Sequence, residues 1–185
     1  MHRPPLAKLA VLALALALAC GPRPSDEAHL RSVRVAGVRI DPGTSNPIVD
    51  LVEDGGAERS LSIAIGEFEA ESIARAIEHQ PAPRPNPHDL LKTLIDTIDG
   101  HVRRTVVTDL REGTYFAVID VELRGRTISV DARPSDAIAI ALRAGAPVLV
   151  RDWLLDAAGE PEDGNSLEID FRAQPRRERR GASPL

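Results

Sequence analysis

The apolar positions along the chain separate an apolar leader, a patterned middle and a polar end. Leu9 to Ala19 is an unbroken run of 11 Leu, Ala and Val residues behind a basic start. A helix of that length is too short to span the hydrocarbon core of a bilayer, which needs about 20 residues. The run therefore predicts a signal peptide over residues 1–19, since a basic stretch precedes its short hydrophobic core.

Alternating apolar and polar residues predict strands both before and after a helical segment. The predicted strands cover residues 33–40, 48–52, 61–65, 102–110, 115–123, 127–130 and 148–150. Gly113 and Gly125 mark turns between three consecutive strands, so this part is expected to form an antiparallel meander.

Three other segments repeat their apolar residues at the period of a helix. They cover residues 67–79, the stretch from Pro87 to just before Gly100, and residues 134–143. The expected apolar faces are Phe68, Ala70, Ile73, Ala74 and Ile77 in the first helix and Leu90, Leu91, Leu94, Ile95 and Ile98 in the second. The third helix has almost no polar face, which predicts burial on most sides. This order of elements predicts an α+β fold with a mainly antiparallel sheet and about three helices, in a single domain over residues 30–158.

Composition narrows the functional classes. Apolar residues make up 43% of the 185 residues, enough for one core, and the formal net charge of −5 argues against a non-specific nucleic-acid coat protein. The single cysteine, Cys20, excludes an internal disulfide framework and a cysteine-rich zinc site. The sequence also lacks a P-loop, a nucleophile elbow and a dinucleotide-binding fingerprint.

Cys20 directly follows the apolar run, and Ala17-Leu18-Ala19-Cys20 resembles a bacterial lipoprotein cleavage box. We expect cleavage before Cys20 and lipidation of its sulfur, with residues 20–29 as a tether. The protein would then be anchored to a membrane of the cell envelope, on the periplasmic side or at the outer membrane. The alternative is an ordinary secretory signal with an incidental cysteine. Residues 159–185 lack a packing pattern and are predicted to be mostly disordered.

Polar residues concentrate at two helix starts. Each has an Arg shortly before a proline and an Asp in the first turn: Arg84 to Asp89 and Asp131 to Asp136. Such a corner is consistent with a capped, salt-bridged turn, with an anion site at a helix N-terminus, or with carboxylates that hold a divalent metal. His88 fits a general base, a metal ligand or a structural hydrogen-bonding residue.

Several ordered blocks resemble the bifunctional nuclease domain family over roughly residues 30 to 155. The blocks are Ile65-Gly66 with Glu69-Ala70, Arg84-Pro85 with His88-Asp89-Leu90-Leu91, Val107 to Leu110, Gly113 to Ala117, and Asp131 to Arg143 with Gly145-Ala146-Pro147. One departure is Pro87, where the family usually has Thr before the His-Asp pair. Asn86 with Pro87 can replace the capping role of that Thr, but not a catalytic role of its hydroxyl.

The resemblance implies a nuclease that acts on DNA, RNA or both, often as a homodimer or higher homo-oligomer. On this basis His88, Asp89, Asp131 and Asp136 are the candidate catalytic residues, and Arg84 and Arg133 the candidate phosphate-binding residues. Asp131, Asp136 and Glu69 are the candidate ligands of a divalent metal, Mg or Mn, which would offset phosphoryl charge. Two alternatives remain open: a non-catalytic binding module in the cell envelope, and a member that has lost activity.

Overall fold

The computed structural model describes residues 29–55, 59–158 and 167–168. The chain divides into two units, residues 1–30 and 31–185, and nearly all of the described residues belong to the second. The predicted signal peptide, Cys20, nearly all of the tether, and the tail apart from residues 167–168 lie outside the described residues. Among the described residues, no helix is long and apolar enough to cross a membrane.

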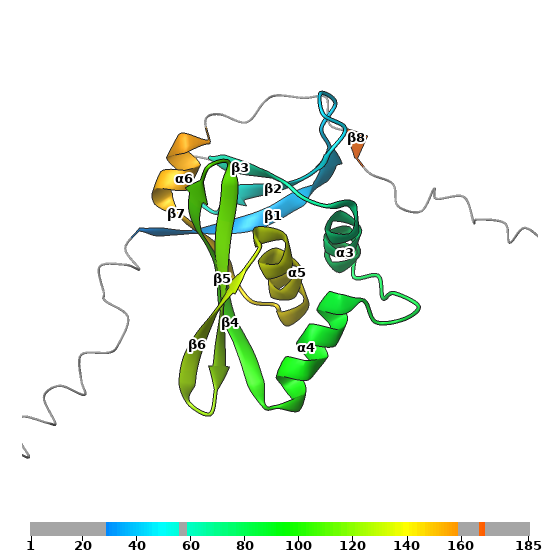
Figure 1. The fold of residues 1–185 in the computed structure, drawn as a ribbon, viewed down its shortest axis with the longest axis vertical. Coiled ribbons are helices and arrows are strands. Elements are labelled where there is room, and N and C mark those ends of the chain that lie inside the picture. Colours follow the sequence, from blue (N-terminus) through cyan, green and yellow to red (C-terminus); the bar gives the residue numbers. More distant parts are fainter. Residues whose placement is uncertain (1–28, 56–58, 159–166, 169–185) are drawn as a thin grey trace, which may run out of the picture. The chain divides into compact units, whose positions relative to one another are not determined.

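One sheet forms the scaffold of the second unit (Figure 1). Its strands follow the order β3-β2-β1-β7-β4-β5-β6, and the two-residue strand β8 pairs with β1. In sequence order the strands are β1 Leu30–Ile40, β2 Pro47–Glu53, β3 Ser60–Ala64, β4 Gly100–Arg111, β5 Thr114–Leu123, β6 Arg126–Ala132, β7 Val148–Arg151 and β8 Leu167–Glu168. The predicted meander is confirmed, because β4, β5 and β6 pair antiparallel in succession. The pairing of β4 with β7 is parallel. Parallel strands need a long connection, which β5, β6 and a helix supply here.

The three longer helices begin at the residues that the sequence predicts. They are α3 Glu67–Ile77, α4 Pro87–Thr97, α5 Pro134–Ala144 and the short α6 Asp152–Ala157. Asn86 and Asp89 form a reciprocal capping box at the start of α4, with Pro87 at its first position. Gly145 ends α5 with a φ of 62°, a left-handed conformation that suits glycine. The α+β prediction is therefore confirmed.

Helix α5 lies between the sheet and the pair of helices α3 and α4 (Figure 1). Its side chains Ala137, Ile138, Ala139, Ile140 and Ala141 are all buried, as its missing polar face predicts. The small alanines allow close approach of the neighbouring elements on several sides. Because α5 is packed in this way, the residues at its start are held firmly, and α3 and α4 are positioned against it.

Two predicted helix faces differ from the structure. Phe68 is 85% exposed, whereas the sequence analysis placed it on the buried stripe of its helix. At 100° per residue, Phe68 lies on the side of α3 opposite to Ile77, so the assignment to that stripe was wrong. On α4 only Ile95 is buried, while Leu90, Leu91, Leu94 and Ile98 are exposed. This helix therefore leaves most of its apolar face without a partner among the described residues.

Candidate functional site

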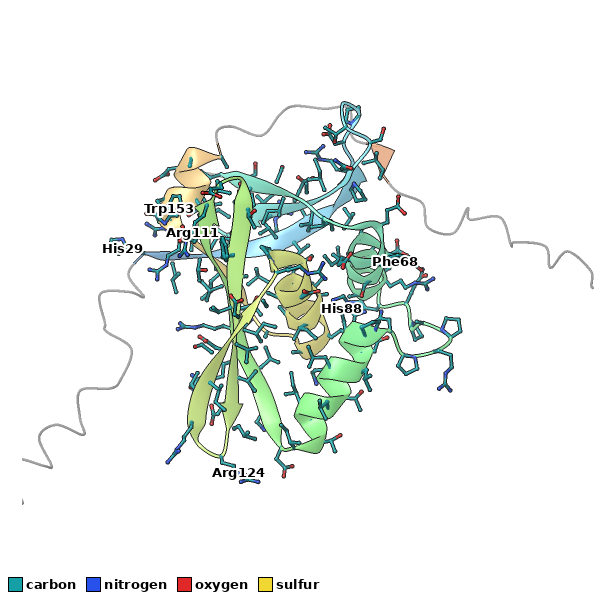
Figure 2. The ribbon with its side chains drawn as sticks, in the orientation of Figure 1. His29, Phe68, His88, Arg111, Arg124 and Trp153 are labelled. Atoms are coloured by element: carbon teal, nitrogen blue, oxygen red, sulfur yellow. The ribbon has the colours of Figure 1, made fainter. Side chains whose placement is uncertain are left out.

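A pocket of about 330 Å³ opens where α3, the start of α4 and the start of α5 meet. Figure 2 shows Phe68 on α3 and His88 at the start of α4, the two labelled residues that line this pocket. One part of the lining is apolar, with Phe68, Ala82, Pro83 and Pro87, and the other part is polar. The polar part includes Glu69, Ser72, His88, Arg133 and Asp136. The structure thus brings together four of the residues predicted from the sequence and adds Ser72.

His88 is held between two hydrogen-bond partners. Its Nδ1 lies 2.8 Å from Ser72 Oγ, and its Nε2 lies 3.1 Å from Asp136 Oδ1. Ser72 Oγ also accepts hydrogen bonds from Arg143 Nη2 at 2.9 Å and Asn86 Nδ2 at 3.1 Å. Since those groups are donors only, the hydroxyl proton of Ser72 is the one left to point at Nδ1. This assigns the imidazole proton to Nε2, where it is donated to Asp136.

Arg133 joins the starts of α3 and α5. Its Nε donates to Asp136 Oδ2 at 2.8 Å, and its Nη2 donates to Asp136 Oδ1 at 2.9 Å and to Glu69 Oε1 at 2.7 Å. Burial alone would raise the pKa of Asp136, but the hydrogen bonds from Arg133 and His88 outweigh burial and lower it. Asp136 therefore stays ionised at neutral pH. The side chain of Arg133 is 64% exposed, and its two Nη1 N–H groups have no acceptor among the described residues.

Behind the pocket, Arg143 locks α5 to α3 and α4. Its Nε donates to Asp89 Oδ1 at 2.6 Å, and its Nη2 reaches both the hydroxyl and the carbonyl oxygen of Ser72. Burial acts to raise the pKa of Asp89, but hydrogen bonds from Arg143 and the Asn86 backbone N–H bring it below its ordinary value. Asp89 thus has two structural partners, and it lines a neighbouring pocket rather than the one that contains His88.

Two further predicted site residues lie outside the pocket. Asp131 is exposed on β6, opposite Val118 of β5, and is not part of the pocket lining. Arg84 is exposed on the connection between α3 and α4, and it forms no ion pair with a described residue. The corner at the start of α5 is the salt-bridged arrangement that the sequence allowed, with Arg133 bound to Asp136 rather than to Asp131.

The predicted metal ligands do not fit a resident ion in this arrangement. Both oxygens of Asp136 accept from Arg133 or His88, and Glu69 Oε1 accepts from Arg133. Across the described parts of the chain, no group of three or more His, Cys, Asp or Glu side chains is placed to hold a metal ion. Metal assistance therefore stays a prediction, and no step below depends on it.

Sequence reasoning missed Ser72, Arg143 and the pocket position of Phe68. Ser72 is 4% exposed on the buried side of α3. A polar residue beside the apolar stripe of the helix is the one sequence signal that could have indicated it. Arg143 resembles any basic residue in the last turn of a helix. Their roles depend on α5 bringing residues 72, 88 and 143 together.

Comparison with known proteins gives a family-model match and several relatives. The model of the bifunctional nuclease domain matches residues 49–163. An uncharacterized protein of Mycobacterium tuberculosis is 39% identical over 127 residues, which are 69% of this chain and 75% of that protein. Bifunctional nuclease 1 of Arabidopsis thaliana is 29% identical over 117 residues, covering 62% of this chain and 36% of the plant protein. Bifunctional nuclease 1 of Oryza sativa subsp. indica is 30% identical over 132 residues, 68% and 39% of the two chains.

The chain has an α+β domain with a pocket, partly apolar and partly polar, at the junction of three helices. It belongs to the bifunctional nuclease domain family. It spans little more than a third of the length of the plant nucleases that it matches.

Proposed function

We propose that the chain is a nuclease that hydrolyses phosphodiester bonds of DNA, RNA or both at the pocket containing His88. The observation that carries this proposal is the contact of His88 Nε2 with the ionised Asp136, beside a guanidinium that has unused donors. A histidine oriented by a carboxylate is a common arrangement for proton transfer. Arg133 keeps Nη1 available for a phosphoryl oxygen, where positive charge stabilises the transition state.

In this proposal water attacks phosphorus and loses a proton to His88. The P–O bond to the leaving sugar oxygen breaks, and the imidazolium returns a proton to that oxygen. Asp136 orients the imidazole and does not itself take up the proton, because its lowered pKa makes it a weak base. Both ring nitrogens are engaged with protein groups, so one of these hydrogen bonds has to open during the reaction. Asp89 and Arg143 hold the frame around this centre rather than meeting the substrate.

A cleavage assay on the purified full-length chain tests the proposal. Labelled single- and double-stranded DNA and RNA are incubated with magnesium, manganese or chelator. We expect His88→Ala and Asp136→Asn to lower the rate by about 100-fold or more, the usual effect of general acid–base groups. Asp131→Asn is the matched carboxylate outside the pocket and should retain activity.

Each contrary result has a definite meaning. Loss of cleavage with Asp131→Asn would return that residue to the site, and loss in chelator would establish the metal requirement. Absence of cleavage by folded wild-type protein would favour the non-catalytic binding module, with the ion pairs of Arg133 serving as architecture only.

We also propose a homodimer or higher homo-oligomer. The exposed apolar residues Leu90, Leu91, Leu94 and Ile98 of α4, with Ile128 and Val130 of the edge strand β6, support this. Apolar patches of this kind mark interaction sites on soluble proteins. Light scattering should give a multiple of the chain mass that Leu94→Glu reduces, and a monomeric wild type would contradict the proposal.

Export and lipid anchoring on Cys20 are proposed from the sequence alone. Metabolic labelling with a radioactive fatty acid in a bacterial host should label the wild type and not Cys20→Ser. Equal labelling of both proteins, or of neither, would refute lipidation at this residue.

A further inference from the structure

The most exposed large apolar side chain of the described residues lies at the pocket proposed as the nuclease site. Phe68 is 85% exposed, while Leu90, the next most exposed, is 64% exposed. Phe68 is one of the few aromatic residues of the chain, which make up 3% of its sequence. Because this ring is left in water, a ligand that covers it would gain free energy from the burial of apolar surface.

The surroundings of Phe68 suit a nucleotide. Ala82, Pro83 and Pro87 continue the apolar side of the same pocket, without hydrogen-bond donors on their side chains. A nucleobase has two apolar faces and is recognised by stacking on aromatic rings. The pocket volume of about 330 Å³ is at the small end of ligand sites, which begin at roughly 300 Å³. It is a compartment for one small group such as a single nucleotide, and not for a duplex.

The polar part of the pocket lies close to Phe68 along the chain. Glu69, the next residue on α3, accepts from Arg133 Nη2 at 2.7 Å, which places the guanidinium at the same helix start. The two Nη1 N–H groups of Arg133, which have no acceptor among the described residues, are available to a phosphate. A nucleotide carries its apolar base and its anionic phosphate on one sugar, so the apolar and cationic parts of the pocket match its two ends.

We infer that Phe68 stacks on an unpaired base and makes this pocket selective for single-stranded DNA or RNA. In a duplex the bases are stacked on one another and their faces are not available without flipping. Strands with unpaired bases offer that face at no such cost. This inference rests on the proposed function, because it names the substrate class of the same site, and Phe68 is a specificity-determining residue rather than a catalytic residue.

The test measures binding, so that it does not depend on cleavage. The full-length chain is titrated into a short labelled single strand, an abasic strand of equal length and charge, and the corresponding duplex, at one fixed salt concentration. Fluorescence anisotropy is read in chelator at low temperature, and gels confirm that the strands stay intact. The variants are Phe68→Leu, Phe68→Trp and Trp153→Leu, the last as a matched exposed aromatic outside the pocket, well away from Phe68 in Figure 2.

We expect Phe68→Leu to weaken binding of the base-bearing single strand by about tenfold to 100-fold, as stacking by one aromatic predicts. Binding of the abasic strand and the duplex should not change, Phe68→Trp should retain affinity, and Trp153→Leu should bind as wild type. In the Trp153→Phe/Phe68→Trp double variant, the introduced indole should be quenched by the base-bearing strand but not by the abasic one.

The inference is overturned if Phe68→Leu binds the base-bearing strand as wild type, or weakens the abasic strand equally. It is also overturned if the introduced indole responds to protein concentration alone, because Phe68 would then be a contact between copies of the chain. Cleavage that persists without any effect of Phe68→Leu would refute this inference and leave the proposed nuclease intact. Base-dependent binding without cleavage by the wild type or any variant would support this inference and refute the proposed nuclease activity.

Discussion

Replacing Ser72 by alanine removes a hydroxyl on α3 that hydrogen-bonds to the start of α4 and to α5 at the candidate site. Ser72 Oγ donates to His88 Nδ1 at 2.8 Å and accepts from Arg143 Nη2 at 2.9 Å and Asn86 Nδ2 at 3.1 Å. The residue is 4% exposed, so the three partners would lose their hydrogen bond with little room to rearrange.

The expected cost follows from these three bonds. A typical hydrogen bond contributes about 1 kcal/mol net to stability, which gives about 3 kcal/mol as an upper value. Arg143 keeps its bonds to Asp89 and to the Ala139 carbonyl, and a water in the adjoining pocket can serve His88. We therefore expect a loss of about 2 kcal/mol. At roughly 4 °C per kcal/mol for a domain of this size, Tm should fall by about 8 °C.

Thermal and urea unfolding of wild type, Ser72→Ala and Ser32→Ala measure this effect. Ser32 Oγ makes one exposed hydrogen bond, to Asp54, so its variant should stay within about 0.5 kcal/mol of wild type. A double-mutant cycle with His88→Ala should give a coupling energy of at least about 0.5 kcal/mol. A Tm for Ser72→Ala within 1–2 °C of wild type would show that this buried network contributes nothing to stability.

Three further predictions concern single groups. Asp136 has a lowered pKa in the folded state, so the unfolded chain binds more protons below about pH 4 and the free energy of unfolding falls with acidification there. Asp136→Asn should reduce the difference between the unfolding free energies measured by urea titration at pH 3 and pH 6, and an unchanged difference would contradict this prediction. The buried Thr105 Oγ1 has no hydrogen-bond partner within the part of the chain that the structure describes, so Thr105→Val should stabilise the protein by about 1 kcal/mol in the same assay. A loss of stability would show that the hydroxyl is satisfied. A Cβ at Gly66 would overlap Glu69 Oε2, so Gly66→Ala should displace the carboxylate that holds Arg133. The cleavage rate should fall severalfold, while Tm falls by only about 1–3 °C. An unaltered cleavage rate would mean that Glu69 does not position Arg133.

The local elements could be predicted from the sequence because their signals are local. The period of the apolar residues gives α3 and α5, the Asn86–Asp89 spacing gives the capping box of α4, and Gly113 and Gly125 give the hairpin turns. The parallel pairing of β4 with β7 could not be read in this way. It joins segments that are separated by β5, β6 and α5, and no local pattern records such a partner.

The candidate site was only partly predictable for the same reason. The sequence determined which polar residues stand at the helix starts. Glu69, His88, Arg133 and Asp136 are first-turn or N-cap residues, and the helix dipole favours the two carboxylates there. Only the tertiary structure decided which of them meet. Packing of the nearly all-apolar α5 against α3 and α4 places His88 between Ser72 and Asp136, and it leaves Asp131 on the edge strand. These side chains are 16 to 64 residues apart, and no local periodicity of apolar and polar residues relates positions so distant in sequence. Their contact is therefore fixed by the packing of the buried helix α5.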